Sequence, residues 1–138
     1  MIVSFTASRQ LKTATDLFHV RDVLEKLQRG DLVVTGGCIG GDHEIAKTAT
    51  KLGLAVHTVL PTDTSRVDPE WEEWCVSWER MPEGTTYRNR NERLVELGNK
   101  LFGFPNLPES RDVRSGTWMT IRIARMAKVP QEVRILHV

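Results

Sequence analysis

Short apolar runs alternate along the chain with segments whose apolar residues recur every three or four positions. Runs of the first kind predict buried β-strands, and segments of the second kind predict amphipathic helices. The expected strands are residues 2–5, 32–34, 54–60, 101–104 and 133–138, and the expected helices are residues 17–27, 45–52, 91–97 and 118–127. Such alternation favours a mostly parallel sheet covered by helices on both faces. We therefore predict an α/β fold, a three-layer αβα domain with a mostly parallel sheet.

An irregular segment, residues 61–86, interrupts this alternation with three prolines and three tryptophans. Within it, Asp68-Pro69 is typical of a helix start, because aspartate caps the first turn and proline is tolerated at its first position. The indoles would then share one face of a short helix: Trp71, Trp74 and Trp78. We expect this face to pack against the domain or against a second subunit. In the second case it would form the interface of the homo-oligomer that we predict. The alternative is a lid whose indole stacks on a bound base.

The composition narrows the class of protein. A chain of 138 residues, 40% of them hydrophobic, is long enough for one domain, residues 1–138, and too short for two. Its formal net charge of +1 makes nucleic acid an unfavoured partner. Two cysteines without a metal-ligand spacing favour a reduced compartment and indicate no metal. Without a basic leader or an apolar run near the roughly 18 residues of a membrane span, we expect a cytoplasmic protein with no membrane partner.

A glycine-rich turn, residues 35–42, separates a predicted strand from a predicted helix and reads TGGCIGGD. Such a turn exposes backbone N–H groups at the positive end of the helix dipole, where phosphate binds well. The chain contains neither G-x-G-x-x-G nor the lysine-bearing phosphate loop G-x-x-x-x-G-K-[ST]. The turn therefore indicates a simpler kind of nucleotide pocket.

Three other segments would meet this turn at the carboxyl ends of parallel strands. Two helix starts with small residues, together with Arg9, Arg88 and Arg90, would supply backbone donors and guanidinium groups for a phosphate. Each arginine alone is more typical of a solvated surface, but their shared place at the strand ends favours an anion site. The segments are residues 6–9, 85–91 and 115–118.

Together these segments resemble the motif series of the SLOG superfamily. This Rossmann-like group includes the LOG cytokinin-activating phosphoribohydrolases, the DNA-processing protein DprA, and small YspA/YpsA-related proteins of bacteria and phages. The last branch matches best, because its glycine turn is followed by a Pro- and Trp-containing segment, an R-N helix start and a G-T helix start. The resemblance extends from residue 2 to about residue 133 and rests on Ser8-Arg9, the glycine turn, Arg88-Asn89-Arg90-Asn91 and Ser115-Gly116-Thr117.

The resemblance implies a Rossmann-like domain that binds a nucleotide or a nucleotide-derived small molecule and carries no cofactor. Its glycine turn and G-T turn would approach the phosphate or ribose, and Asp42 would either cap a helix or accept from a ribose hydroxyl. The ligand-binding residues so implied are Ser8, Arg9, Gly36, Gly37, Cys38, Gly40, Gly41, Asp42, Arg88, Asn89, Arg90, Ser115, Gly116 and Thr117. Only His43, of the four histidines, is expected near this site. Cys38 at a helix start could be a nucleophile, although a small buried cysteine is the commoner role.

One departure from the LOG pattern bears on catalysis. LOG enzymes carry P-G-G-x-G-T-x-x-E, whose final glutamate acts in cleaving the N-glycosidic bond, and here Thr120 occupies that position. A threonine supplies neither an anion nor a general acid at neutral pH. The leading hypothesis is therefore nucleotide binding or sensing without turnover. Two alternatives stay open: a LOG-like N-glycoside hydrolase or ribosyl transferase that uses another carboxylate, and DprA-like single-strand DNA binding.

Overall fold

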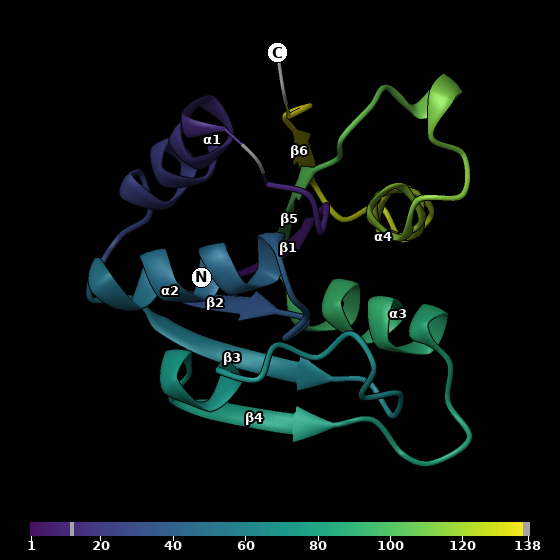
Figure 1. Ribbon diagram of the computed structural model, residues 1–138, viewed down its shortest axis with the longest axis horizontal. Helices are drawn as coiled ribbons and strands as arrows, with labels where there is room; N and C mark the ends of the chain where they lie inside the picture. The colour runs from purple at the N-terminus through teal and green to yellow at the C-terminus, as the bar shows by residue number, and fades with distance from the viewer. Residues whose placement is uncertain (12, 137–138) are drawn as a thin grey trace.

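The computed structural model describes residues 1–11 and 13–136, and its central element is one six-stranded sheet (Figure 1). Every neighbouring pair of strands is parallel, and the order across the sheet is β4-β3-β2-β1-β5-β6. This confirms the predicted α/β fold with a parallel sheet. The strands are β1 (Ile2–Ala7), β2 (Leu32–Thr35), β3 (Ala55–Leu60), β4 (Ser77–Arg80), β5 (Lys100–Phe104) and β6 (Gln131–Val133).

Two layers of helices enclose the sheet. Helices α1 and α2 bury their apolar faces on the side of the sheet that presents Val3 and Phe5, whereas α3 and α4 pack on the side that presents Leu101. None of the described helices is both long enough and apolar enough to cross a membrane. The helices are α1 (Ala14–Glu25), α2 (Gly41–Lys51), α3 (Tyr87–Leu97) and α4 (Gly116–Met126), and two short 3-10 helices are η1 (Trp71–Trp74) and η2 (Glu109–Arg111).

The predicted tryptophan helix is wrong. Residues 71–74 form only the short helix η1, after which Cys75 is extended, with φ −148° and ψ 154°. The N–H of Val76 then donates to the carbonyl of Val56 at 2.9 Å, so the chain joins the edge of the sheet as β4. Trp78 lies on this strand, where its ring meets that of Trp71 edge-on at a centroid distance of 5.3 Å. Hydrogen bonding to a distant strand therefore overrides the local helical spacing.

The last strand is also shorter than the apolar run at residues 133–138 predicts. β6 ends at Val133, and the following residues run beside β5 through two backbone hydrogen bonds, from Arg134 to Gly103 and from Leu136 to Pro105, at 2.9 and 2.8 Å. Residues 137 and 138 of the predicted strand lie outside the described residues.

Candidate functional site

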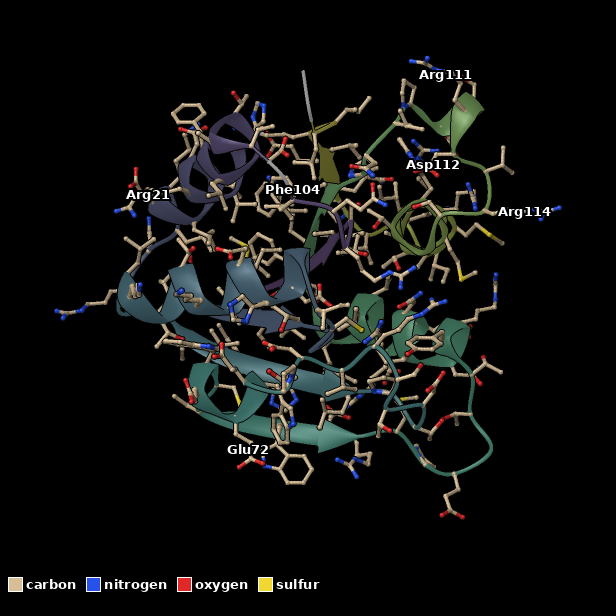
Figure 2. The ribbon with its side chains drawn as sticks, in the orientation of Figure 1. Arg21, Glu72, Phe104, Arg111, Asp112 and Arg114 are labelled. Atoms are coloured by element: carbon tan, nitrogen blue, oxygen red, sulfur yellow. The ribbon has the colours of Figure 1, made fainter. Side chains whose placement is uncertain are left out.

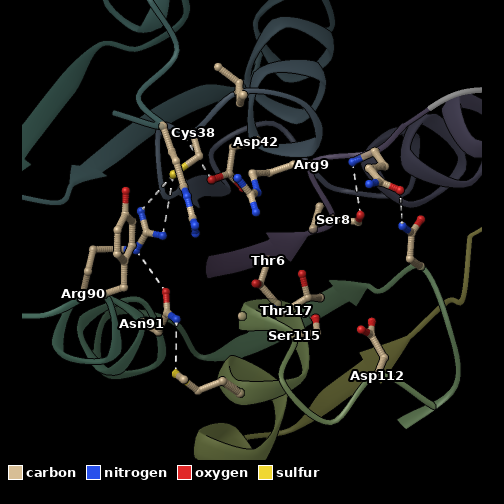
Figure 3. Close-up of a pocket in the computed structure, with 18 of the residues that line it drawn as sticks. Thr6, Ser8, Arg9, Cys38, Asp42, Arg90, Asn91, Asp112, Ser115 and Thr117 are labelled. Atoms are coloured by element: carbon tan, nitrogen blue, oxygen red, sulfur yellow. Dashed lines mark hydrogen bonds between the residues drawn. The ribbon is translucent and has the colours of Figure 1, made fainter. Parts of the chain in front are cut away.

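A cavity of about 660 Å³ opens beyond the carboxyl ends of β1 and β5 (Figure 3). From β1 the chain leads through α1 to β2 on one side, and from β4 it returns through α3 to β5 on the other side. The boundary between β1 and β5 is therefore the point where the strand order reverses. In open α/β sheets this is where ligands bind, because the loops at the strand ends diverge there and leave a crevice.

The structure brings only some of the predicted ligand-binding residues to this cavity. Those that line it are Ser8, Arg9, Cys38, Asp42, Arg90, Ser115, Gly116 and Thr117. Those outside its lining are Gly36, Gly37, Gly40, Gly41, Arg88 and Asn89. Arg88 is exposed, and Asn89 belongs to the cap of α3, where its side-chain oxygen accepts from the N–H of Thr86 at 3.0 Å. The R-N motif thus contributes Arg90 to the cavity and uses Asn89 to begin the helix.

The glycines of the turn lie where two backbones approach closely. A Cβ on Gly40 would collide with the carbonyl of Arg9, and a Cβ on Gly41 would lie 2.5 Å from the carbonyl oxygen of Ser8. The N–H of Gly41 donates to that same oxygen at 3.0 Å. A side chain at Gly36 would collide with the Arg90 guanidinium. Gly36, Gly40 and Gly41 lack side chains because Arg90 and the end of β1 occupy the space that a Cβ would need.

A buried polar cluster forms the inner wall of the cavity. Arg90 is 7% exposed and donates to the carbonyl of Gly36 at 2.5 Å and to the side chain of Asn91 at 3.0 Å. Asp42 is 7% exposed and accepts from the N–H of Cys38 at 3.2 Å. Burial raises the pKa of Asp42 above its ordinary value, although the Arg90 guanidinium and the Cys38 N–H oppose the rise.

The same cluster sets the protonation state of the Cys38 thiol. Burial and the neighbouring Asp42 carboxylate raise the pKa of the Cys38 thiol, while Arg90, whose guanidinium lies 3.7 Å from the sulfur, lowers it less. The thiol is therefore protonated at neutral pH. A nucleophilic cysteine needs a lowered pKa, so Cys38 contributes a small side chain to the wall.

Two arginines share one aromatic ring beside this cluster. The guanidinium carbons of Arg66 and Arg90 lie 5.6 and 5.5 Å from the ring centroid of Tyr87, within range of a cation–π contact. The Tyr87 hydroxyl donates to the carbonyl of Asp63 at 3.3 Å, which ties the ring to the segment that carries Arg66. The sequence gives no signal for Arg66, because it lies in the irregular segment far from any recognised motif.

The opposite wall comes from the start of α4 and the loop before it. The Ser115 hydroxyl caps this helix by accepting from the N–H groups of Thr117 and Trp118 at 3.1 and 3.3 Å. The loop adds Asp112 and Arg114 to the lining, and Figure 2 shows both on the loop that rises beside α4. Sequence patterns predicted the Ser-Gly-Thr helix start but missed these two charged residues, which carry no motif of their own.

Thr120 does not face the cavity. Its side chain is fully buried, and its hydroxyl donates to the carbonyl of Gly116 at 2.9 Å within α4. The carboxylates that line the cavity are instead those of Asp42 and Asp112. The position at which the LOG pattern has its glutamate is therefore a core position of this helix.

His43 also lies outside the cavity lining. Its Nδ1 is 2.6 Å from Asp68, and the second oxygen of Asp68 accepts from the N–H of Glu70 at 3.0 Å. The side chains of His43, Asp68 and Glu70 bring potential metal ligands within 4.8 Å of one another. Because both oxygens of Asp68 already accept hydrogen bonds, the contacts act as a tie between α2 and the start of η1.

Positive charge predominates in the cavity. Of the residues that the structure describes, two aspartates and four arginines line it, the arginines being Arg9, Arg66, Arg90 and Arg114. Among the ion pairs of residues 1–11 and 13–136, none includes Arg9, Arg66 or Arg114. Unpaired guanidinium groups around one crevice offer several N–H donors to an anion, in a fork that suits phosphate or carboxylate.

Comparison with known proteins finds no matching protein-family model and no matching curated protein. Solved structures do match, and they share the Rossmann-like α/β fold. The structural-genomics target TM1055 has a TM-score of 0.67 and 18% identity over 94% of this chain and 71% of its own. A molybdenum cofactor binding protein from Rippkaea orientalis has a TM-score of 0.69 and 18% identity over 97% of this chain and 76% of its own.

DprA from Streptococcus pneumoniae matches with a TM-score of 0.70 and 17% identity over 96% of this chain, which spans 49% of that protein. At these identities the likeness concerns the fold. The chain therefore has the Rossmann-like architecture that these neighbours share, with its cavity at the reversal of strand order.

Proposed function

We propose that this chain binds a nucleotide or a nucleotide-derived small molecule through its phosphate, in the cavity at the carboxyl ends of β1 and β5. One observation carries the proposal. Four separate segments each contribute an arginine to the lining of the same crevice, and three of these arginines have no carboxylate partner among the described residues. The cavity volume of about 660 Å³ falls within the usual range for small-molecule sites, roughly 300–1,000 Å³.

Different walls of the cavity would contact different parts of the ligand. Arg9, Arg66 and Arg90 would neutralise the phosphate, while the start of α4 would present the hydroxyl of Thr117 and the positive end of its helix dipole. Asp42, whose pKa is raised, would be available to hydrogen-bond a ribose hydroxyl. The proposal includes binding without turnover, because the position of the LOG glutamate is a buried threonine.

The neighbours support ligand binding by this architecture and differ in what they bind. The Rippkaea orientalis protein binds a molybdenum cofactor, whereas DprA from Helicobacter pylori binds single-stranded DNA. The net charge of +1 favours a small ligand here, because a polyanion is bound by many cations spread along a surface.

Isothermal titration calorimetry with ribonucleoside 5′-monophosphates, the matched nucleosides and inorganic phosphate tests the proposal. Arg9→Ala and Arg66→Ala should each raise the Kd for the best monophosphate by about 10- to 150-fold, the range for loss of a charge-assisted hydrogen bond. Arg88→Ala is the matched control, because Arg88 is exposed and lies two positions from Arg90 but outside the cavity lining. Its affinity should equal that of the parent.

Three results would overturn the proposal. The first is equal weakening by Arg88→Ala, which would place the anion elsewhere. The second is binding of an oligonucleotide with a steep salt dependence when no monophosphate binds, which would favour the DprA-like alternative. The third is catalytic release of free base, which would favour the hydrolase.

A further inference from the structure

β4 forms an open edge of the sheet. Among residues 1–11 and 13–136 it pairs with β3 alone, so the backbone groups on its outer side have no partner strand in that part of the chain. An unpaired edge is a template for another strand, and proteins commonly protect it with proline, lysine or a covering segment. Residues 76–80 read VSWER and contain neither proline nor lysine. At the opposite edge, β6 is three residues long and directly follows Pro130.

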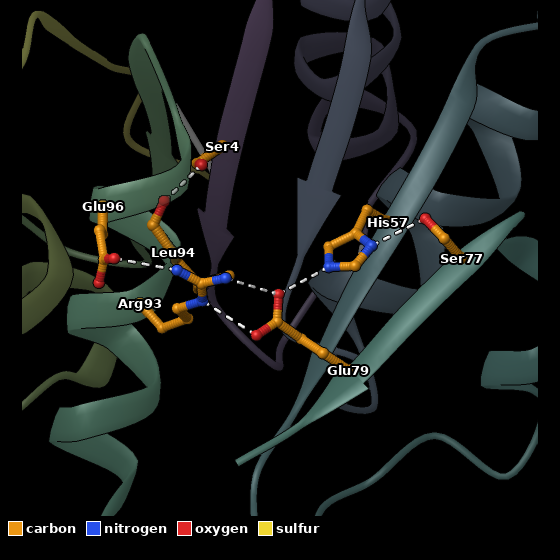
Figure 4. A network of polar contacts seen from close by, with 7 residues as sticks. All are labelled: Ser4, His57, Ser77, Glu79, Arg93, Leu94 and Glu96. Atoms are coloured by element: carbon orange, nitrogen blue, oxygen red, sulfur yellow. Dashed lines mark hydrogen bonds and ion pairs between the residues drawn. The ribbon is translucent and has the colours of Figure 1, made fainter.

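Side chains on the inner face of β4 hold the strand in place (Figure 4). Ser77 and Glu79 both contact His57 on β3, at 2.8 and 2.9 Å from its two ring nitrogens. Arg93 of α3 donates from Nε to Glu79 at 2.9 Å. These contacts fix which face of the sheet each side chain of β4 points to. The opposite face therefore carries Val76, Trp78 and Arg80. Contacts within a single chain are therefore enough to order β4.

That other face is apolar and exposed. Val76 is 76% exposed and Trp78 is 54% exposed, and the ring of Trp71 extends the surface from η1. Cross-strand pairs of aromatic and β-branched residues are the contacts that stabilise antiparallel sheets. We call Trp71, Val76, Trp78 and Arg80 the β4 surface. None of them lines the cavity at the switch point.

The charges around this surface complement one another under two-fold symmetry. An antiparallel pairing of β4 with itself, centred on Trp78, places Val76 of each copy opposite Arg80 of the other. Arg80 would then reach toward the acidic helix η1 of the other copy, which carries Glu72 and Glu73. Figure 2 labels Glu72 near β4. Among the ion pairs of the described residues, none includes these three charged residues. A self-complementary patch is the requirement for a two-fold dimer.

We propose that the partner of the β4 surface is a second copy of this chain, joined by antiparallel pairing of the two β4 strands about Trp78. The two sheets become one continuous sheet, with the Trp78 side chains adjacent at the axis and Arg80 of each copy beside η1 of the other. The contact is small, so the dimer forms reversibly with concentration.

Sedimentation velocity of the full chain over a concentration series tests this pairing. The parent should form a dimer, and Trp78→Lys should raise its dissociation constant at least tenfold, because two like charges would meet at the axis. Phe18→Lys is the matched control, since Phe18 is a 62% exposed aromatic on α1, away from β4. Its dissociation constant should equal that of the parent. Amide hydrogen exchange in residues 76–80 of the parent should slow as the concentration rises.

A charge reversal tests the same contact without touching the tryptophan. Arg80→Glu should weaken the dimer, and adding Glu72→Arg and Glu73→Arg should restore it; this series decides the matter if Trp78→Lys fails to fold. A parent that stays monomeric at every concentration would overturn the proposal. So would a dimer that survives Trp78→Lys with a native melting temperature, or one whose β4 amides exchange at an unchanged rate.

Discussion

Substitutions at Gly37 and Gly116 separate a glycine that the fold requires from one that the cavity requires. The sequence predicts that valine at either position abolishes binding by filling the space of the phosphate. The structure gives the two residues different surroundings. Gly37 is buried and outside the cavity lining, with φ +69°, whereas Gly116 is exposed at the first position of α4 and lines the cavity.

The expected cost at Gly37 follows from its neighbours. A Cβ there would lie 2.7 Å from Cγ2 of Thr58 and 2.8 Å from Cδ2 of Leu60, and both side chains are 1% exposed and cannot move aside. Overpacking of this kind costs about 1–3 kcal/mol. A positive φ costs an L-residue about 1–2 kcal/mol more. Gly37→Ala should therefore lower the free energy of unfolding by about 2–4 kcal/mol, after the smaller gain from a stiffer unfolded chain.

At Gly116 a Cβ would meet no heavy atom of the described residues within 4 Å. Gly116→Ala should change the free energy of unfolding by less than about 0.5 kcal/mol, as exposed substitutions do. Gly116→Val should also fold, but its side chain would stand at the start of α4, where the anion is proposed to bind, and nucleotide affinity should fall.

Urea and thermal denaturation measure both effects. For a chain of 138 residues, the loss at Gly37 corresponds to a fall in Tm of roughly 6–16 °C. These expectations fail if Gly37→Ala melts with the parent, or if Gly116→Ala loses as much stability as Gly37→Ala. They also fail if Gly116→Val binds nucleotides as tightly as the parent.

Three further predictions concern the thiol, the edge network and turnover. Iodoacetamide at pH 7 should alkylate Cys38 far more slowly than a free cysteine, because burial raises the pKa of its thiol; rapid labelling in a peptide map would contradict this. Burial would raise the pKa of Glu79, but hydrogen bonds from Arg93 and His57 outweigh it and hold that pKa below its ordinary value of 4.5. Glu79 therefore contributes stability above pH 4.5 that is lost as the pH falls through its lowered pKa. In urea denaturation, Glu79→Gln should accordingly have a lower free energy of unfolding than the parent at pH 7, and this difference should shrink on acidification. A difference that does not depend on pH would refute the assignment. Nucleoside monophosphates should release no free base above the buffer rate by liquid chromatography, and Thr120→Glu should lower the Tm without creating hydrolysis, because residue 120 faces the core.

Local features of the sequence determined much of this architecture. The alternation of apolar runs with helical spacing predicted the α/β fold, because burial on a sheet or a helix imposes its own period on the side chains. The glycine turn and Ser115 marked two helix starts at the cavity, because close backbone approach and helix capping depend on residues adjacent in the chain. The sequence therefore predicts where the cavity lies, but it does not predict all of the residues that line it.

Tertiary structure decided the rest, through contacts between residues distant in the chain. Helical spacing predicted one face for the tryptophans, but hydrogen bonds to β3 draw Trp78 onto the sheet edge. Arg88 and Arg90 are indistinguishable in the R-N motif, and only the packing of α3 against the glycine turn buries Arg90 and leaves Arg88 in solvent. Arg66 and Arg114 line the cavity from loops without periodicity or motif. Their positions depend on how the loops close over the strand ends, which no local pattern encodes.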